Sequence, residues 1–270
     1  MKIQTFIVDS FTDQPFSGNP AGVCLLEKAL DYGLMQNIAT ELNLSETAFI
    51  LPIQEKKNSY SIQYFTPTVE VDFCGHATLA AAKVTLEKTG ASEVQFQTVH
   101  NLELKALKGE KDIILYFPIY QTVNHAFDKQ LLEAFGIKNP IAVKYAKDLD
   151  MVVVEIADKE TLINLKPDFQ KAVNTSTSIK ELVVTCKSND DEYDFYSRCF
   201  CPWIGINEDP VTGAAHAVLA SYWATELNKS EMKAFQLSKR GGYLNLRIVS
   251  KNQLEVQSNA CILFEGVLHL

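Results

Sequence analysis

The chain has 270 residues, of which 47% are hydrophobic and 21% are charged, and its formal net charge is −8. This composition is typical of a globular protein with a sizeable core, in one large domain or two smaller ones. The acidic balance excludes nucleic acid and anionic membranes as expected partners, because both need a basic surface. It leaves a small anionic ligand open, since the charge of one site is independent of the total.

The chain starts with MKIQTFIVDSF, which predicts a strand and lacks the features of a signal peptide. No apolar run reaches the roughly 18 residues that indicate a transmembrane helix. The six cysteines form no C-x-x-C pair, so we expect a reduced, cytoplasmic protein without a disulfide framework. Cys199 and Cys201 should point to opposite faces of one strand, which argues against a shared metal ion or disulfide.

Strands dominate the predicted elements, because β-branched and aromatic residues recur between turn-forming segments. In the first half, an amphipathic helix is predicted at Asp31–Leu42, and strands are predicted near Ile3–Phe11, Gly22–Leu26, Thr47–Ile53, Tyr60–Thr66, Glu93–His100, Leu102–Leu107 and Asp112–Phe117. In the second half, short helices are predicted at Leu131–Phe135 and Thr161–Leu165. Strands there are predicted near Ile141–Tyr145, Met151–Ile156, Glu181–Cys186, Asp194–Phe200, Ala234–Ser238, Tyr243–Val249, Gln253–Gln257 and Ile262–His269.

Two further helices, at 75–86 and 211–226, are almost free of charged residues. HATLAAAKV has its first charge at Lys83, and VTGAAHAVLASYWAT has none before Glu226. A helix that is apolar on all sides is buried on all sides. Each half of the chain is therefore predicted to hold one central helix surrounded by strands.

The two central helices belong to an internal repeat. A Phe-x-Pro segment precedes each of them, FTP at 65–67 and FCP at 200–202, followed by an acidic segment, a glycine and a helix that carries a histidine. The prediction is an α+β fold with two pseudo-symmetric halves, 1–120 and 121–270, each a mostly antiparallel sheet rolled around its helix. The boundary is expected within 118–129. A cleft between such halves is the expected ligand site.

Each central helix is predicted to begin at a glycine-containing turn, at Gly75 and at Gly213. A helix N-terminus offers unpaired N–H groups and the positive end of the helix dipole, so it can bind a carboxylate. Glycine lets a ligand approach the backbone closely. The alternative is that each glycine only starts a packed helix.

Two acids are candidates for proton transfer. Glu46, in LNLSETAFI, lies between the amphipathic helix and an apolar strand, and Asp209, in NEDPVTG, precedes a proline. Partial burial would raise the pKa of either carboxyl and suit it to acid–base work. The alternative for Glu46 is a capping role at a turn, and the alternative for Asp209 is an N-cap with proline at the first helical position.

His76 lies in the first turn of a central helix, where the dipole disfavours imidazolium, so a neutral histidine able to relay a proton is expected. His216 lies further into its helix and is predicted to be structural. Cys74 precedes its helix by one residue and would be acidified there, although buried cysteines are commonly structural. A zinc site is not expected, because Cys74 and His76 lack a second pair of ligands at a usual spacing.

Four segments of the chain resemble, in order, the signature blocks of the phenazine-biosynthesis-like family: FIVDSFTDQPFSGNPAGVCLL, LNLSETAFIL, FTPTVEVDFCGHATLAAA and INEDPVTGAAHAVLASYW. The resemblance implies the diaminopimelate-epimerase-like fold. It also implies isomerisation by proton transfer on a small carboxylate substrate, without cofactor or metal, in a homodimer.

The resemblance also implies roles for individual residues. Glu46 would be the general acid and base, helped by His76 and Asp209. Substrate binding would fall to Asn19, Gly75, Thr212, Gly213 and Ala214. Ala214 departs from the family's phenazine enzyme, which has serine there, so one hydroxyl donor is missing. Cys74 stands where related epimerases have a cysteine, but their second cysteine has no counterpart. A one-cysteine epimerase that uses Cys74 and a non-catalytic small-molecule binder therefore stay open as alternatives.

Overall fold

The chain, described from a computed structural model, is traced here for residues 1–126, 128–176 and 178–270. It forms two units: unit 1 is Met1–Tyr116 with Val256–Leu270, and unit 2 is Phe117–Glu255. The sequence-based division placed all of 121–270 in the second half. Residues 256–270 lie in unit 1 because the last strand pairs with the first along its whole length. Residue 127, within the predicted boundary segment, lies outside the described residues.

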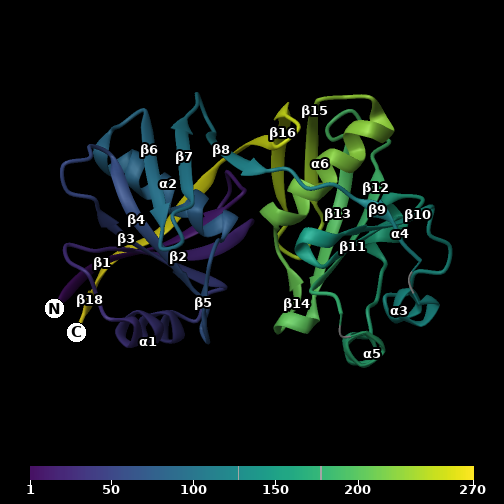
Figure 1. Cartoon of the computed structure of the whole chain (residues 1–270), viewed down its shortest axis with the longest axis horizontal. Coiled ribbons are helices and arrows are strands. Elements are labelled where there is room, and N and C mark those ends of the chain that lie inside the picture. The colour runs from purple at the N-terminus through teal and green to yellow at the C-terminus, as the bar shows by residue number, and fades with distance from the viewer. Residues whose placement is uncertain (127, 177) are drawn as a thin grey trace. The chain divides into compact units, whose positions relative to one another are not determined.

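Unit 1 holds two helices, α1 and α2, among antiparallel and parallel strand pairs (Figure 1). Its central strand β1 pairs with β2 and with β18, antiparallel in both cases, and β2 pairs with β3 in parallel. The elements in chain order are β1 (Lys2–Ser10), β2 (Asn19–Leu25), α1 (Tyr32–Leu42), β3 (Glu46–Pro52), β4 (Ser59–Phe65), β5 (Glu70–Val71), α2 (Gly75–Thr89), β6 (Glu93–Thr98), β7 (Glu103–Lys108), β8 (Ile113–Pro118), and, at the end of the chain, β17 (Gln253–Ser258) and β18 (Ala260–His269). The last two residues of β8 and the first three of β17 fall in unit 2.

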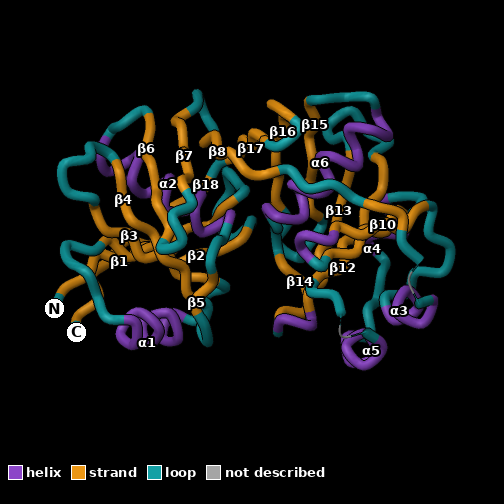
Figure 2. The backbone as a smooth tube through the Cα atoms, viewed as in Figure 1, coloured by secondary structure: helices purple, strands orange, loops and turns teal. Residues whose placement is uncertain are grey.

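Unit 2 is built around α6, and short helices follow several of its strands (Figure 2). Strand β12 pairs with β11 in parallel and with β13 in the antiparallel direction. The elements are β9 (Val123–Asn124), α3 (Lys129–Ala134), β10 (Ala142–Ala146), η1 (Lys147–Leu149), β11 (Met151–Glu155), α4 (Lys159–Ile163), α5 (Phe169–Thr175), β12 (Glu181–Lys187), β13 (Phe195–Cys201), η2 (Pro202–Ile204), β14 (Ile206–Asp209), α6 (Gly213–Leu227), β15 (Glu231–Gln236) and β16 (Gly242–Ser250).

The internal repeat is visible in the strand connections of the two units. In unit 1, β4 and β6 are parallel neighbours joined through β5 and α2. In unit 2, β13 and β15 are parallel neighbours joined through β14 and α6. Each of these parallel pairs then continues into an antiparallel hairpin, β6–β7 and β15–β16. The predicted α+β class, with mostly strands and one central helix in each unit, is confirmed.

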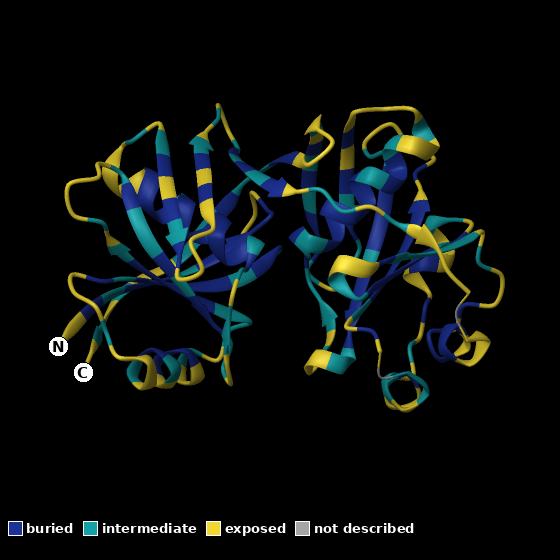
Figure 3. Ribbon diagram, viewed as in Figure 1, coloured by how far each residue is buried: buried dark blue, intermediate teal, exposed yellow. Residues whose placement is uncertain are grey.

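Both central helices are buried over most of their length (Figure 3). Helix α2 contacts β1, β2, β3, β6, β7 and β18, which explains its small side chains. Hydrogen bonds join polar groups inside each core, which offsets the free-energy cost of burying them. The Tyr64 hydroxyl lies 2.6 Å from Thr78 Oγ1 in unit 1, and the Trp223 indole N–H donates to Thr185 Oγ1 over 2.9 Å in unit 2.

The two central helices also begin in the same way. The N-cap residues are Cys74 and Thr212; neither side chain makes a capping hydrogen bond, and no acidic residue lies in either first turn. Helix α1, in contrast, is capped by Asp31, which accepts a hydrogen bond from the Leu34 amide over 2.9 Å. The capping alternative for Asp209 is therefore wrong, because Thr212 holds that position. Among the described residues, no helix combines the length and apolar character needed to cross a membrane.

Candidate active site

An ion pair between Glu46 and His76 forms the centre of the candidate site in unit 1. Glu46 is the first residue of β3, and His76 lies in the first turn of α2. Its Nε2 atom lies 3.0 Å from Glu46 Oε2. The His76 side chain is 8% exposed and the Glu46 side chain 14%, so both are largely buried and Glu46 is the more exposed of the two. The fold thus brings together two predicted catalytic residues.

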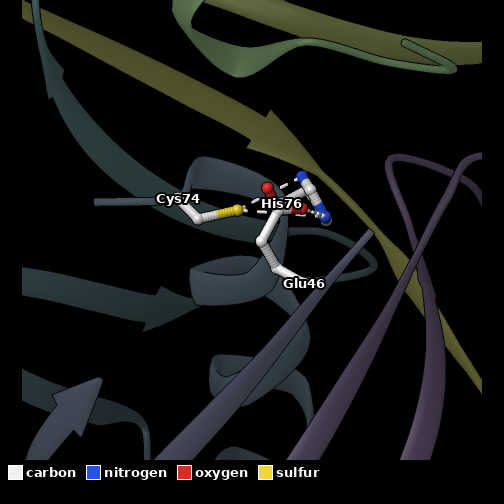
Figure 4. Close-up of side chains that lie close together, drawn as sticks. All are labelled: Glu46, Cys74 and His76. Atoms are coloured by element: carbon white, nitrogen blue, oxygen red, sulfur yellow. Dashed lines mark hydrogen bonds and ion pairs between the residues drawn. The ribbon is translucent and has the colours of Figure 1, made fainter. Parts of the chain in front are cut away.

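Cys74 lies beside the His76 imidazole (Figure 4), and Asn19 contacts it as well. The Cys74 sulfur lies 3.3 Å from His76 Nδ1 and 3.8 Å from Nε2. The Asn19 amide nitrogen, at the start of β2, lies 3.3 Å from Nδ1. Cys74 and Asn19 are both buried. The imidazole is therefore held between a thiol and an amide on one side and a carboxylate on the other.

Two hydrogen bonds, one from β1 and one from within α2, fix the first turn of α2. The Ser10 hydroxyl, at the end of β1, donates to the His76 carbonyl over 2.7 Å, and the Thr78 hydroxyl donates to the Cys74 carbonyl over 2.7 Å. Ser10 and Thr78 are completely buried. These bonds hold the backbone that carries both the thiol and the imidazole, so the site is preorganised by the fold.

Replacing Ser10 with Ala should lower the free energy of unfolding by about 0.5–1.5 kcal/mol, the usual net value of one hydrogen bond. Denaturant titration of the variant beside wild type measures the loss. Ser59→Ala is a suitable control, because its hydroxyl makes a longer contact of 3.3 Å to a turn carbonyl. Equal stability of Ser10→Ala and wild type would contradict the positioning role.

The pair is charged near neutral pH. Burial acts to raise the pKa of Glu46, but the charge of His76 and hydrogen bonds from His76 and Cys74 outweigh it, and the net shift is downward. Burial acts to lower the pKa of His76, yet the neighbouring Cys74 and Glu46 raise it well above its ordinary value. From the sequence we expected a raised pKa for Glu46 and a neutral His76. Both expectations are wrong, because two buried groups of opposite charge stabilise each other's charged forms.

The Cys74 thiol does not share in this charging. Burial and the nearby Glu46 carboxylate raise its pKa, and the opposing effect of His76 is smaller. The acidification expected from the helix dipole is therefore outweighed, and the net shift of the Cys74 pKa is upward.

In unit 2, Asp209 and Thr212 are held together at the start of α6. Thr212 Oγ1 donates to Asp209 Oδ2. Gln236, completely buried at the end of β15, binds both ends of this turn: its amide donates to the Asp209 carbonyl over 2.7 Å and accepts from the Thr212 amide over 3.0 Å. Sequence reasoning missed Gln236, because only the parallel pairing of β13 and β15 brings its strand to this turn.

A second missed group is Glu181, at the start of β12. Burial raises the pKa of Glu181 to about 7, and the nearby Asp209 charge adds to the shift. The Cys199 thiol donates to Glu181 Oε2 over 3.6 Å.

Cys199 also hydrogen-bonds Cys201, which helps to raise the Cys199 pKa. The prediction that these two thiols face opposite ways is wrong, because β13 is irregular between them: Cys199 pairs with Asp209 and Cys201 with Ile206.

His216 occupies α6 in the role predicted for it. It is completely buried, with its Nδ1 atom 2.8 Å from the Thr212 carbonyl and its Nε2 atom 3.5 Å from the Ser197 hydroxyl. Burial lowers its pKa to about 4, although the contact with the Thr212 carbonyl acts in the opposite direction. No carboxylate is among these contacts, so this histidine is neutral and His76 is not.

The pKa of His216 predicts a pH dependence of stability. Its folded value, about 4, lies below the ordinary histidine value of 6.5, so the unfolded chain takes up the proton first as the pH falls. The His216 contribution is full above pH 6.5 and is lost towards pH 4, a change of about 3 kcal/mol. Urea titrations of wild type and His216→Asn at several pH values measure it. A difference between the two proteins that stays constant across this window would contradict the assignment.

The predicted site residues thus fall into two groups. Asn19, Glu46, Cys74, Gly75 and His76 lie together in unit 1. Asp209, Thr212, Gly213 and Ala214 lie together at the start of α6 in unit 2, where Gly213 is buried and Ala214 is half-buried. Both groups surround a central helix N-terminus that no side chain caps. Their roles in catalysis and binding are taken up below as proposals.

Comparisons with known proteins agree on one family. The model of the family described as phenazine biosynthesis-like protein matches residues 8–266. A Halalkalibacterium halodurans protein described as an uncharacterized isomerase is 42% identical over 252 residues, which cover 92% of each chain. The crystal structure of a phenazine biosynthesis protein of the PhzF family from Enterococcus faecalis superimposes with a TM-score of 0.91 at 35% identity, covering 100% of both chains.

A more distant likeness concerns the fold alone. The crystal structure of a hydroxyproline epimerase from Agrobacterium vitis gives a TM-score of 0.59 at 9% identity, with 99% of this chain and 92% of the epimerase covered. The epimerase-like fold that the sequence motifs implied is therefore confirmed.

Proposed function

The chain belongs to the phenazine biosynthesis-like family, and on this premise we propose that it is an isomerase that moves a proton within a small, carboxylate-bearing metabolite. The Halalkalibacterium relative is described as an isomerase, which supports this reaction class. We propose that the reaction needs no cofactor, because one carboxyl group of suitable reach can both accept and return a proton.

The Glu46–His76 ion pair is the observation that carries the proposal. A general base must be ionised and reachable, and the Glu46 carboxylate is held ionised by His76 at 3.0 Å while 14% of its side chain stays exposed. In the proposed reaction, Glu46 takes a proton from one carbon of the substrate and returns it to another position. His76 balances the carboxylate charge and keeps its oxygen in place.

The start of α2 is proposed to bind the substrate carboxylate. Its N-cap, Cys74, makes no capping hydrogen bond, and the half-buried Gly75 brings no side chain between the helix N-terminus and a ligand. An anion there would gain from the helix dipole and from backbone N–H groups. The same proposal assigns substrate contacts to Asn19.

The proposal includes residues of unit 2 because they lie in INEDPVTGAAHAVLASYW, one of the four segments that resemble the family. Asp209 is proposed to assist the proton transfer, and Thr212, Gly213 and Ala214 to contact the substrate. Ala214 offers only its backbone, so a substrate recognised here gains no side-chain hydroxyl at this position. A homodimeric assembly is part of the same proposal.

Proton exchange from solvent tests the function even while the substrate is unidentified. Purified chain would be incubated in D₂O with a panel of small α-amino acids, cyclic amino acids and unsaturated carboxylates, and each would be followed by NMR. We expect deuterium to enter a carbon position of at least one panel member. Binding of panel members with no exchange in any of them would refute the isomerase and favour a non-catalytic binding protein.

A one-cysteine epimerase is the second candidate, and the position of Cys74 favours it. Its sulfur lies 3.3 Å from Nδ1 and 3.8 Å from Nε2 of the imidazole that contacts Glu46 at 3.0 Å, so a thiol and a carboxylate lie close together. Two such groups could remove and replace a proton at one stereocentre. This candidate predicts inversion at the exchanged carbon and loss of inversion in Cys74→Ser. Exchange that moves the proton between two carbons would exclude it.

A further inference from the structure

Glu46, Cys74 and His76 form a cluster with the three ligand types that zinc prefers. Each offers one ligand atom, and these atoms all lie within 4.8 Å of one another. Figure 4 shows the sulfur, the imidazole and the carboxylate pointing toward one another. Sequence spacing gave no reason to expect a metal, because Cys74 and His76 alone are two ligands. The third ligand comes from β3, a different element of the fold.

The spacings of the ligand atoms are near those of a tetrahedral site. Zinc bonds of about 2.0–2.3 Å to nitrogen, oxygen and sulfur place neighbouring ligand atoms about 3.3–3.6 Å apart. In the cluster, His76 Nε2 lies 3.0 Å from Glu46 Oε2 and 3.8 Å from Cys74 Sγ. Because Cys74 Sγ also lies 3.3 Å from Nδ1, an ion bound at Nε2 requires the Cys74 side chain or the imidazole ring to rotate toward it.

The charges of the three side chains, and the contact of His76 with Asn19, also suit a divalent cation. A thiolate, a carboxylate and a neutral imidazole together carry two negative charges, which a divalent cation balances in a buried site. Ligating histidines are normally oriented by a partner on the other ring nitrogen. With Nε2 on the metal, Nδ1 faces the amide of Asn19 at 3.3 Å; rotation of that amide presents its oxygen to an Nδ1–H donor.

We propose that Glu46, Cys74 and His76 bind a thiophilic divalent cation, Zn²⁺ or Cd²⁺, and that the bound ion blocks proton transfer by Glu46. On binding, the Cys74 thiol and the His76 imidazolium release one proton each to solvent, and a bond forms from each ligand atom to the metal. The partly exposed Glu46 side chain provides the solvent-facing edge for entry. Binding stands by itself; only the inhibition rests on the proposed function.

The binding test uses Cd²⁺, since a cadmium–thiolate bond gives a charge-transfer absorption in the ultraviolet. Wild-type chain should show a saturable band at one ion per chain, displaced by Zn²⁺. Cys74→Ser should lose the band, and Glu46→Gln should bind more than about 100-fold more weakly, as losing a ligand costs more than losing an outer contact. Cys261→Ser, a partly exposed thiol outside the cluster, should keep both band and affinity.

A second measurement needs no variant. Imidazole resonances of labelled histidine in wild-type chain should shift for His76 and stay in place for His216 as Cd²⁺ is added. No saturable band, a band that persists in Cys74→Ser and disappears in Cys199→Ser, or an unshifted His76 would each overturn the site.

The inhibition is tested on any panel carboxylate that wild-type chain exchanges in D₂O. Zn²⁺ should stop exchange over the same concentration range that displaces Cd²⁺. Zinc bound at the cluster with undiminished exchange would overturn the inhibition and leave the isomerase standing. A chain that exchanges no carboxylate yet binds the metal would refute the proposed function and leave the metal site standing.

Discussion

His76→Leu should lower the free energy of unfolding at neutral pH by about 3–5 kcal/mol, the usual effect of removing one partner of a buried ion pair. The Glu46 carboxylate, 14% exposed, would then be left without the imidazolium at 3.0 Å. Its pKa would rise, because burial would no longer be opposed by the His76 charge. Urea titration at neutral pH measures the loss.

The pair also gives the effect a pH dependence with a definite sign. The raised pKa of His76 means that its contribution is present below the unfolded value and is lost as pH rises through the folded value. The lowered pKa of Glu46 means that its contribution is present above the unfolded value and is lost as pH falls through the folded value. The difference in unfolding free energy between wild type and His76→Leu should therefore be largest above the unfolded pKa of Glu46 and below the unfolded pKa of His76.

The double variant Glu46→Gln/His76→Leu separates the charge from the packing. Without the carboxylate, no unpaired charge stays buried, so the double variant should be more stable than the sum of the two single changes predicts. Additive losses would contradict a coupled pair. A His76→Leu loss that is equally large at a pH where Glu46 is protonated would contradict it too.

The fold was largely predictable, because its signal repeats along the chain. Two helices with almost no charged residues predicted two buried central elements, and α2 and α6 are these elements. What the sequence did not reveal was the place of the last strand: β18 pairs with β1, and no local pattern records a partner at the far end of the chain. Helix α5 was missed as well, because Phe169–Thr175 is too short for periodicity to identify it.

The candidate site was predictable in composition and not in charge. The motifs named Glu46, His76 and Cys74, but the direction of each pKa depends on a distance between different elements. The helix dipole alone suggested a neutral His76, whereas a carboxylate from β3 at 3.0 Å reverses that expectation. Gln236 and Glu181 carry no motif of their own and become visible only when strand pairing places them beside Asp209 and Thr212.

Glu46→Gln should slow the proton transfer by about 10²–10⁴-fold, the usual contribution of a positioned general base. The amide has the shape of the carboxylate but cannot accept the proton at neutral pH. Binding of a panel carboxylate should change much less, since Glu46 is proposed to act on the proton and not on the carboxylate group. The variant also leaves His76 buried without its partner, so its folding must be verified by circular dichroism at the assay temperature.

Two controls bracket this change. Glu41→Gln, an exposed position in α1, should keep the wild-type rate. Glu46→Asp keeps a carboxylate but withdraws it by one methylene, so its rate should lie between those of wild type and Glu46→Gln.

The rate of deuterium incorporation from D₂O, compared in wild type and folded Glu46→Gln on the same carboxylate, tests the central claim most directly. The account predicts incorporation at a carbon position by wild type and a loss of at least about 10²-fold in the variant, with the dissociation constant of the carboxylate nearly unchanged. Incorporation by folded Glu46→Gln at the wild-type rate would contradict the account, because a group other than Glu46 would then carry the proton.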